Sequence, residues 1–394
     1  MKIKNTVTTD SANAVSNTTD TSQNRSVISN AMKINSILMF MAFCVKGYAQ
    51  VSLPYSTDFE SQEGFVDEAP LSVEWAITDT SIVVSDDTAQ SGAQSVRITP
   101  ATPENIISLR FDPSGNSILF LNYHVKLTAS DLPDLPLLTT PETMAILTVR
   151  PYGVGFGEWG FLDGDSIGSG DWYFPGNPLG LNNSGQTSWQ QVTLRLNLQS
   201  NLWDVYINGK LRAFDLGFVE APIPGSEAIN LYGSSIGATY LDNLSLLTTN
   251  PLFRDLDQDG VEDAFEDTHG LDPSVNDRYL DADADGLTNI YEYLNDLSPN
   301  SKDTDDDGLE DGWEVNNGYS ASANEGIAGA FGDLEGDRLA NQTESNVGSS
   351  PSTVDTATTL VGTNTQSGGD LAITLIGRGN FTVDEAATAS LLSD

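Results

Sequence analysis

The sequence is poor in cysteine, histidine and basic residues. Its 394 residues include one cysteine (Cys44), two histidines (His124 and His269) and 17 lysines and arginines, against 56 aspartates and glutamates, for a formal net charge of −39. One cysteine and two histidines are too few for a zinc site of the usual kind. Nucleic acids and anionic membranes require a basic surface that such a chain lacks. We therefore expect no nucleic-acid partner, and the acidity favours calcium or basic partners.

Long apolar runs are also scarce, and the longest lies near the N-terminus. Residues 34–45 are mostly apolar, follow Lys33 and precede Gly47-Tyr48-Ala49, which is the order of a secretory signal. The run is too short to span a membrane, and no later segment is apolar enough for a transmembrane segment. We predict a signal peptide at 32–49, a non-structural extension at 1–31, and a secreted, extracellular or cell-surface location. Because cleavage would remove Cys44, core burial or metal must stabilise the remainder.

Residues 51–248 show the alternation of short β-strands separated by turn residues. Residues 118–127 place apolar side chains at every second position, and residues 190–198 repeat this pattern. Residues 202–214 contain two alternating runs around Asn208-Gly209, a pair that tolerates the positive φ angles of a tight hairpin. The segment predicts an all-β fold, an antiparallel β-sandwich, with Trp189 and Trp203 in its core.

Four short motifs in this segment resemble those of laminin-G-like, concanavalin A-like jelly-roll domains. They are YSTDFE at 55–60, WQQV at 189–192, WDVYINGK at 203–210 and YLDN at 240–243. The resemblance implies a jelly-roll sandwich that binds glycan or protein. It also implies that Glu60 and Asp242 share a structural calcium between the first and last strands.

A Gly- and Asp-rich segment, residues 153–176, carries further aromatic residues. Trp159, Trp172 and Tyr173 are candidate ligand-binding residues, because aromatic faces beside carboxylates can stack on a sugar ring. The alternative is that these aromatics pin a long loop to the sandwich.

Two enzyme patterns fail in the sandwich segment. Gly164-Asp165-Ser166-Ile167 matches the GDS block of SGNH hydrolases, but neither histidine is placed to activate the serine. The segment that begins at Glu158 lacks the E-x-D-x-x-E spacing of laminarinase-type glucanases. No catalytic residue is therefore assigned. Carboxylates paired from separate strands, such as Glu158 or Asp171, remain an alternative that the sequence does not reveal.

The strongest pattern is a twelve-residue carboxylate motif that occurs four times in residues 251–351. Residues 251–350 hold 26 of the 56 acidic side chains and 4 of the 17 basic ones. Each copy has oxygen donors at positions 1, 3, 5, 9 and 12, and three copies have Gly at position 6, where the chain must turn sharply. The predicted ligands, with position 7 acting through its backbone carbonyl, are Asp255, Asp257, Asp259, Val261, Asp263 and Glu266 in the first loop; Asp281, Asp283, Asp285, Leu287, Asn289 and Glu292 in the second; Asp303, Asp305, Asp307, Leu309, Asp311 and Glu314 in the third; and Asp333, Glu335, Asp337, Asn341 and Glu344 in the fourth.

This spacing wraps alternate carboxylates around a cation, and six or seven oxygens suit Ca²⁺ better than the strictly octahedral Mg²⁺. Two features oppose an EF-hand. Pro251 leaves no room for a helix before the first loop, and position 8 is not consistently apolar. The layout instead resembles the bacterial form of the thrombospondin type 3 repeat, which implies a string of metal-centred loops with little apolar core. Arg338 replaces the glycine in the fourth copy, so we expect that loop to bind weakly or not at all.

The sequence therefore predicts a secreted calcium-binding protein. A jelly-roll domain at 51–248 would recognise extracellular polysaccharide or a surface protein, and an irregular calcium-loop repeat array at 251–351 with short helical turns would form a stiff stalk. Residues 352–394 form a Ser/Thr-rich C-terminal segment. A glycan-active enzyme and an inert structural spacer are the alternatives.

Overall fold

The computed structural model describes residues 50–323 except 72–74, 78, 100–105, 114, 128–144, 146, 152–155, 168, 176–177, 181–186, 222–227 and 233–236, together with residues 329, 331–332 and 340–347. The predicted extension 1–31, the signal peptide 32–49 and the C-terminal segment 352–394 lie outside the described residues. Among the helices that are described, none has the length and apolar character needed to cross a membrane.

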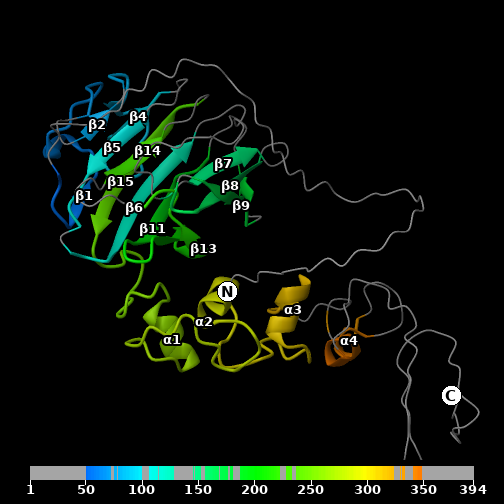
Figure 1. Ribbon diagram of the computed structural model, residues 1–394. Helices are drawn as coiled ribbons and strands as arrows, with labels where there is room; N and C mark the ends of the chain where they lie inside the picture. The colour runs from blue at the N-terminus through cyan, green and yellow to red at the C-terminus, as the bar shows by residue number, and fades with distance from the viewer. Residues whose placement is uncertain are drawn as a thin grey trace, which may run out of the picture. The chain divides into compact units, whose positions relative to one another are not determined.

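The largest sheet has eight strands, in the order β13-β12-β11-β6-β15-β4-β3, with β1 paired to β15 (Figure 1). Neighbouring strands run antiparallel. The strands are β1 (Tyr55–Thr57), β3 (Val83–Ser85), β4 (Ser95–Ile98), β6 (Ile118–Leu127), β11 (Gln190–Asn197), β12 (Leu202–Ile207), β13 (Lys210–Gly217) and β15 (Thr239–Leu247).

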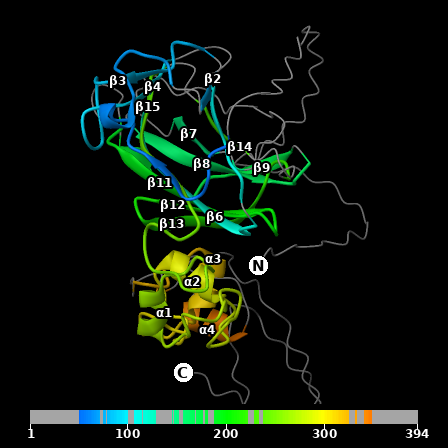
Figure 2. The ribbon, with the colours of Figure 1, turned by 90° about the vertical axis from the view of Figure 1, so that its left-hand side faces the viewer.

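Two smaller antiparallel sheets complete the sandwich (Figure 2). One has the order β10-β8-β7 with β9 paired to β8, and the other has the order β14-β5-β2. Their strands are β2 (Trp75–Ile77), β5 (Ile106–Arg110), β7 (Leu147–Pro151), β8 (Phe156–Gly164), β9 (Gly170–Tyr173), β10 (Pro178–Gly180) and β14 (Ala228–Tyr232). A short 3-10 helix, η1 (Ser61–Glu63), follows β1. The predicted all-β class and antiparallel sandwich are confirmed.

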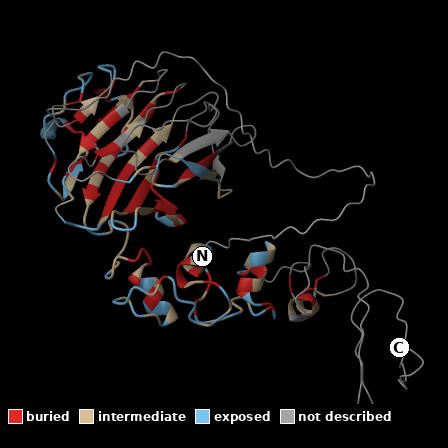
Figure 3. Cartoon of the chain, in the orientation of Figure 1, coloured by how far each residue is buried: buried red, intermediate tan, exposed pale blue. Residues whose placement is uncertain are grey.

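One hydrophobic core lies between the large sheet and the smaller ones. It takes Leu119 and Leu121 from β6 and Val192 and Leu194 from β11, and it takes Phe161 from β8 on the opposite side. Figure 3 shows the buried residues concentrated along these strands. The alternation of residues 118–127 and 190–198 therefore predicts the core-facing side chains correctly, because every second side chain of a strand points to the same face.

The predicted hairpin is also present. Asn208 and Gly209 connect β12 to β13 with φ angles of 53° and 80°. Trp203 on β12 is fully buried, and its Nε1 donates to the carbonyl of Gly217 over 3.1 Å. Trp189 is only partly buried, because it precedes β11 instead of lying within it.

The described residues of the repeat segment form loops and four helices of seven residues: α1 (Asp263–His269), α2 (Asn289–Asn295), α3 (Asp311–Asn317) and α4 (Asn341–Val347). Each helix begins at position 9 of a motif. Residues 250–254, before the first motif, form no helix. The expectation that the loops are not entered by helices, as EF-hand loops are, is thus met at the first loop.

We predict that Phe161→Ala lowers the free energy of unfolding of the sandwich by about 3–5 kcal/mol, since it removes a buried ring and leaves a cavity. Phe161 is fully buried, and its ring meets that of Trp203 edge-on at 6.3 Å. Chemical denaturation followed by tryptophan fluorescence measures the effect. Phe331→Ala is the matched control, because Phe331 is 87% exposed and its loss should change stability by less than about 0.5 kcal/mol. Equal effects of the two substitutions would contradict the assigned core.

Candidate metal centre

The first three motifs fold into the same tight loop. Position 4 and position 6 both adopt positive φ in each of them: 62° and 97° at Gln258 and Gly260, 65° and 103° at Ala284 and Gly286, and 57° and 98° at Asp306 and Gly308. Glycine adopts this conformation at low cost, whereas other residues do so rarely. Position 6 was expected to turn sharply, but the left-handed residue at position 4 was not expected.

Each loop uses oxygens of its first three aspartates to hold its own backbone, and in the second and third loops both oxygens of the position-1 aspartate do so. In the first loop Asp255 Oδ2 accepts from Gly260 N at 3.2 Å, Asp257 Oδ1 from Asp259 N at 3.1 Å, and Asp259 Oδ1 from Val261 N at 2.8 Å. The second and third loops repeat these three bonds. The spacing of the aspartates therefore fixes the loop shape as well as supplying ligands.

The base of each loop is closed by a backbone bond. The N–H at position 9 donates to the carbonyl that precedes position 1, from Asp263 to Arg254 at 3.0 Å, Asn289 to Leu280 at 2.8 Å, Asp311 to Lys302 at 2.6 Å, and Asn341 to Gly332 at 2.9 Å. The fourth motif shares this closure. Its first three carboxylates, Asp333, Glu335 and Asp337, lie outside the described residues, while Asn341 and Glu344 are buried in α4.

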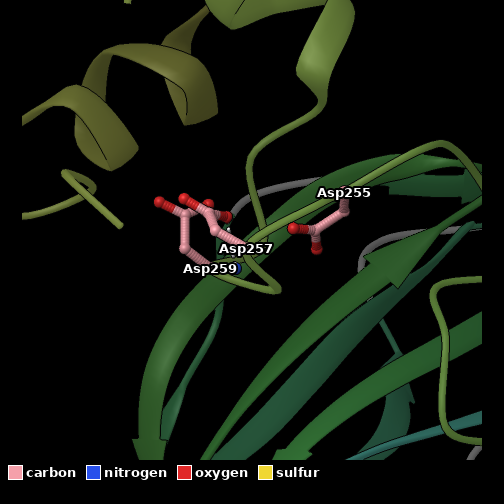
Figure 4. A group of neighbouring side chains, drawn as sticks. All are labelled: Asp255, Asp257 and Asp259. Carbon is pink, nitrogen blue, oxygen red and sulfur yellow. Dashed lines mark hydrogen bonds between the residues drawn. The ribbon is translucent and has the colours of Figure 1, made fainter. Parts of the chain in front are cut away.

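Several of the remaining oxygens converge and have no hydrogen-bond donor among the described residues, although Asp285 Oδ2 accepts from Gly312 N at 2.7 Å. Within each of the three loops the aspartates at positions 1, 3 and 5 offer one ligand atom each, and these atoms lie within 4.8 Å of one another (Figure 4 shows the first loop). The glutamates at position 12 are almost fully buried. The buried oxygens without a donor are Asp255 Oδ1, Asp257 Oδ2, Asp259 Oδ2 and both Oε of Glu266; Asp283 Oδ2, Asn289 Oδ1 and both Oε of Glu292; and Asp305 Oδ2 and Glu314 Oε2. Buried carboxylate clusters of this kind could hold a metal ion.

The electrostatics of the loops reflect this lack of positive partners. Burial, reinforced by the neighbouring carboxylates, raises the pKa of Glu266, Glu292 and Glu314 to about 8. Burial likewise raises the pKa of Asp255 to about 6 and that of Asp259 to about 7. A cation among these groups would lower these pKa values again, since an opposite charge within a few ångströms favours the ionised carboxylate.

The predicted ligands at positions 9 and 7 also make contacts within the protein. At position 9 of the first loop, Asp263 Oδ1 accepts from Leu256 N at 2.8 Å, and in the third loop both oxygens of Asp311 accept from Thr304. These carboxylates brace position 2 of their loops. At position 7, Val261, Leu287 and Leu309 bury their side chains, which leaves only their backbone carbonyls as ligands.

The structure adds one carboxylate that lies outside every motif. Asp277, in the segment between the first two loops, lies with Asp259 and Glu266 in a group whose ligand atoms are within 4.8 Å of one another. Its Oδ1 also accepts from Asn289 Nδ2 of the second loop at 3.1 Å. Asp277 thus joins two neighbouring loops. The sequence motif could not identify it, because it is eleven residues beyond position 12.

The sandwich carboxylates Glu60 and Asp242 are surrounded by backbone donors. Asp242 Oδ2 accepts from Gln90 N at 2.8 Å and Ser91 N at 3.2 Å, and Glu60 Oε1 accepts from two further N–H groups of the same loop. Burial raises the pKa of Asp242, and the charge of Glu60 adds to the effect. The two side chains are brought together by that loop, and calcium between them remains a prediction.

The three aromatic candidates differ in exposure. Trp159 on β8 is 4% exposed and belongs to the sandwich core. The burial of its ring among apolar side chains fits the alternative in which these aromatics pack on the sandwich. Trp172 is partly buried against Leu162 and Val219 and stacks on Phe174 at 6.1 Å. Tyr173 on β9 is 42% exposed. The segment forms the β8–β9 pair with Asp163 opposite Asp171, not one long loop.

The described residues give no support to the serine hydrolase pattern. Ser166 lies in the β8–β9 turn, where its N–H donates to the carbonyl of Phe218 at 2.8 Å. His124 is on β6, and burial lowers its pKa. His269 ends α1, and its Nδ1 lies 2.8 Å from the carbonyl of Phe265. The two histidines thus lie in separate elements, β6 and α1, and neither contact involves Ser166.

We predict that Asp277→Asn weakens Ca²⁺ binding at the first loop about tenfold, because affinity depends on the number of charged ligands and on the groups that orient them. Calorimetric titration of the whole chain should show the loss in one class of site. Asp272→Asn is the matched control: Asp272 is exposed, bonds to Ser274 and belongs to no cluster. If both substitutions left the titration unchanged, Asp277 would not be a ligand.

No known family model matches the sequence, and no curated protein sequence matches it. Among solved structures, a carbohydrate esterase from the Shiga toxin-encoding bacteriophage phi24B is similar over 44% of this chain and 88% of that one, with 9% identity and a TM-score of 0.29. Cellulose induced protein, Cip1, is similar over 50% and 97%, with 14% identity and a TM-score of 0.29. A sialidase is similar over 55% of this chain and 20% of its own, with 11% identity and a TM-score of 0.31. Similarities this weak say nothing of what this chain binds.

Proposed function

We propose that this chain is a secreted calcium-binding protein. In this proposal calcium-filled loops order residues 251–351, and the sandwich of residues 51–248 serves as the recognition domain. The observation that carries the proposal is the set of buried oxygens without a donor, which recurs at positions 3 and 12 of all three loops, together with the close approach of the aspartates at positions 1, 3 and 5. Burying an ionised carboxylate without a partner is strongly unfavourable, so a cation is the partner that these loops require.

The donor set favours calcium over other cations. All side-chain ligands at motif positions 1, 3, 5, 9 and 12 are carboxylate or amide oxygens, which hard cations prefer. A position-12 glutamate with two free oxygens can bind through both, and the position-7 carbonyl adds another oxygen. That number of ligands fits calcium, whereas magnesium retains several waters and a strict octahedron. Extracellular calcium modules bind at roughly 10⁻⁴–10⁻³ M, so calcium outside a cell would fill these loops.

Little apolar burial supports the repeat segment without the ions. One of its clusters consists of Leu287, Leu297 and Ala321, with Tyr291 and Val315 packed against them. Another joins Val261 and Ile290 to the sandwich. Neither cluster supplies a positive partner for the buried carboxylates of the loops, so we expect metal binding to contribute to folding.

We predict that chelation with EDTA exposes the repeat segment to chymotrypsin, with cleavage after Tyr291 and Trp313 at position 11 of the second and third loops. Without the ion the loops repel and open, whereas Trp203 in the sandwich core stays protected. Mass spectrometry of the fragments locates the cuts. Restoring Ca²⁺ should restore resistance, and the same concentration of Mg²⁺ should not. Identical digestion with and without EDTA would contradict the proposal.

For the sandwich we propose recognition of extracellular polysaccharide or of a surface protein. The supporting observation is Tyr173, whose exposed ring lies next in sequence to Trp172 and two residues from exposed Asp171 on β9. An aromatic face beside a carboxylate can stack on a sugar and accept from its hydroxyls. The alternatives are a glycan-active enzyme that uses carboxylates such as Glu158 or Asp171, and an inert spacer.

We predict that a glycan array probed with the calcium-loaded chain shows binding. Tyr173→Ala should weaken this binding at least about tenfold, because stacking of the sugar on the aromatic ring would supply much of the binding free energy. Phe331→Ala, which removes another exposed ring, is the matched control and should bind normally. Binding that Tyr173→Ala leaves intact would move the ligand site elsewhere on the sandwich. Turnover of the bound glycan would indicate the enzyme, and no binding at all would favour the spacer.

A further inference from the structure

The outer face of β11 and β12 carries charged and polar side chains that are buried. Arg195 on β11 pairs in register with Asp204 on β12, and Thr193 pairs with Tyr206. Their neighbours Leu194, Leu196 and Val205 point into the sandwich core, so these side chains point away from it. Arg195, Asp204 and Tyr206 are nevertheless at most 4% exposed. The first motif loop covers them.

Three successive carbonyls of that loop are held by three different donors. The carbonyl of Gln258 accepts from Arg195 through Nε at 2.9 Å and Nη2 at 2.6 Å. The carbonyl of Asp259 accepts from Arg278 Nη1, and that of Gly260 accepts from the hydroxyl of Tyr206 at 2.5 Å. These residues are positions 4, 5 and 6, the tight turn in which Gln258 and Gly260 have positive φ.

Asp204 holds the two arginines in place. Its Oδ2 lies 2.9 Å from Arg195 Nη1 and 3.0 Å from Arg278 Nη1. Arg278 comes from the segment after α1 and is 1% exposed, and it also contacts Asp215 at 3.4 Å. Asp204 and Asp215 offset the positive charge of the two guanidinium groups, which would otherwise repel a cation in the adjacent loop.

The contact also requires a glycine at position 6. A Cβ atom on Gly260 would lie 3.0 Å from Tyr206 Oη, 3.1 Å from Asp204 Oδ2 and 3.2 Å from Arg278 Nη1. On Gly286, the corresponding residue of the second loop, a Cβ would meet nothing within 4 Å. The position-6 glycine therefore allows the positive φ of the turn in both loops. Only in the first loop does it also allow close packing against other side chains.

The second and third loops have weaker support at these carbonyls. In the second, exposed Lys302 donates to the carbonyl of Ala284 at 2.6 Å. In the third, Gln342 Nε2 lies 3.3 Å from the carbonyl of Gly308. Neither donor is part of a buried ion network among the described residues.

We propose that Tyr206, Arg195 and Arg278, oriented by Asp204, are positioning residues that preorganise the first loop for calcium, so that it binds more tightly than the second and third. A loop already held in its bound shape loses less conformational freedom on binding. The coupling is reciprocal: calcium in the first loop stabilises the sandwich as well as the repeat segment. This inference rests on the proposed calcium function and adds an order of calcium affinity among the three loops.

The test uses Tyr206→Phe in two versions of the full chain. The first version carries Glu292→Gln, Glu314→Gln and Glu344→Gln, so that the first loop is the intact one. The second carries Glu266→Gln, which disables the first loop alone. Ca²⁺ titration by calorimetry should show five- to tenfold weaker binding for Tyr206→Phe in the first version, as expected for loss of one buried hydrogen bond, and less than a twofold change in the second.

Tyr279→Phe is the matched control, because its hydroxyl donates to Asp215 at 2.8 Å and not to a loop carbonyl; it should change the affinity less than twofold. Thermal unfolding gives a second readout. Calcium should raise the melting temperature of the sandwich in the first version and not in the second. Arg195→Lys, which loses the bonds to Gln258, provides another variant should Tyr206→Phe prove unstable.

The outcomes separate the two ideas. Absence of Ca²⁺ binding in both versions would overturn the calcium function itself. Binding in the second version without binding in the first, or binding in the first that neither Tyr206→Phe nor Arg195→Lys weakens, would overturn the preorganisation alone. A loss of stability without a loss of affinity would show that the contacts are merely structural.

Discussion

The structure of the repeat segment depends on one constraint: a carboxylate buried without a donor cannot remain ionised unless a cation joins it. Glu266, Glu292 and Glu314 are each at most 1% exposed, and each has at least one oxygen without a donor among the described residues. The aspartates at positions 1, 3 and 5 use at least one oxygen each to shape their loop. The same carboxylates that shape the loops thus also supply the oxygens that lack a partner.

The same constraint is met differently where the repeats join the sandwich. There the buried carboxylate is Asp204, and its partners are Arg195 and Arg278. Two arginines on one fully buried aspartate would leave excess positive charge, which Asp215 offsets through its contact with Arg278. Both arginines also donate to carbonyls of the first loop. Ion pairs of this kind stabilise little by themselves. They specify which surface of the sandwich the first loop covers.

Much of this was predictable from the sequence, for reasons that differ by element. The alternation around Leu121 and Val192 identifies the core because a strand has a strict period of two, and Asn208-Gly209 identifies its turn because few residues accept positive φ. The motif spacing brought Asp255, Asp257 and Asp259 together because they are neighbours in the chain. Where a contact is distant in sequence the prediction was incomplete: the sequence left open whether Trp159 binds a ligand or packs on the sandwich, and the burial of Arg195 was missed. Alternation tells which side of a sheet a residue faces, but not what covers that side.

The scarcity of basic residues follows from the same reasoning. Residues 251–350 contain four of them, and a lysine or arginine within reach of a free carboxylate would satisfy it and displace the need for a metal. Of the four, Arg278 is committed to Asp204, Lys302 is exposed, and Arg254 reaches Asp263 from a position that is 74% exposed. None of these three is a donor to the free oxygens of Glu266, Glu292 or Glu314. The buried carboxylates of these loops therefore stay available to a metal ion, because the described basic side chains of the segment do not donate to them.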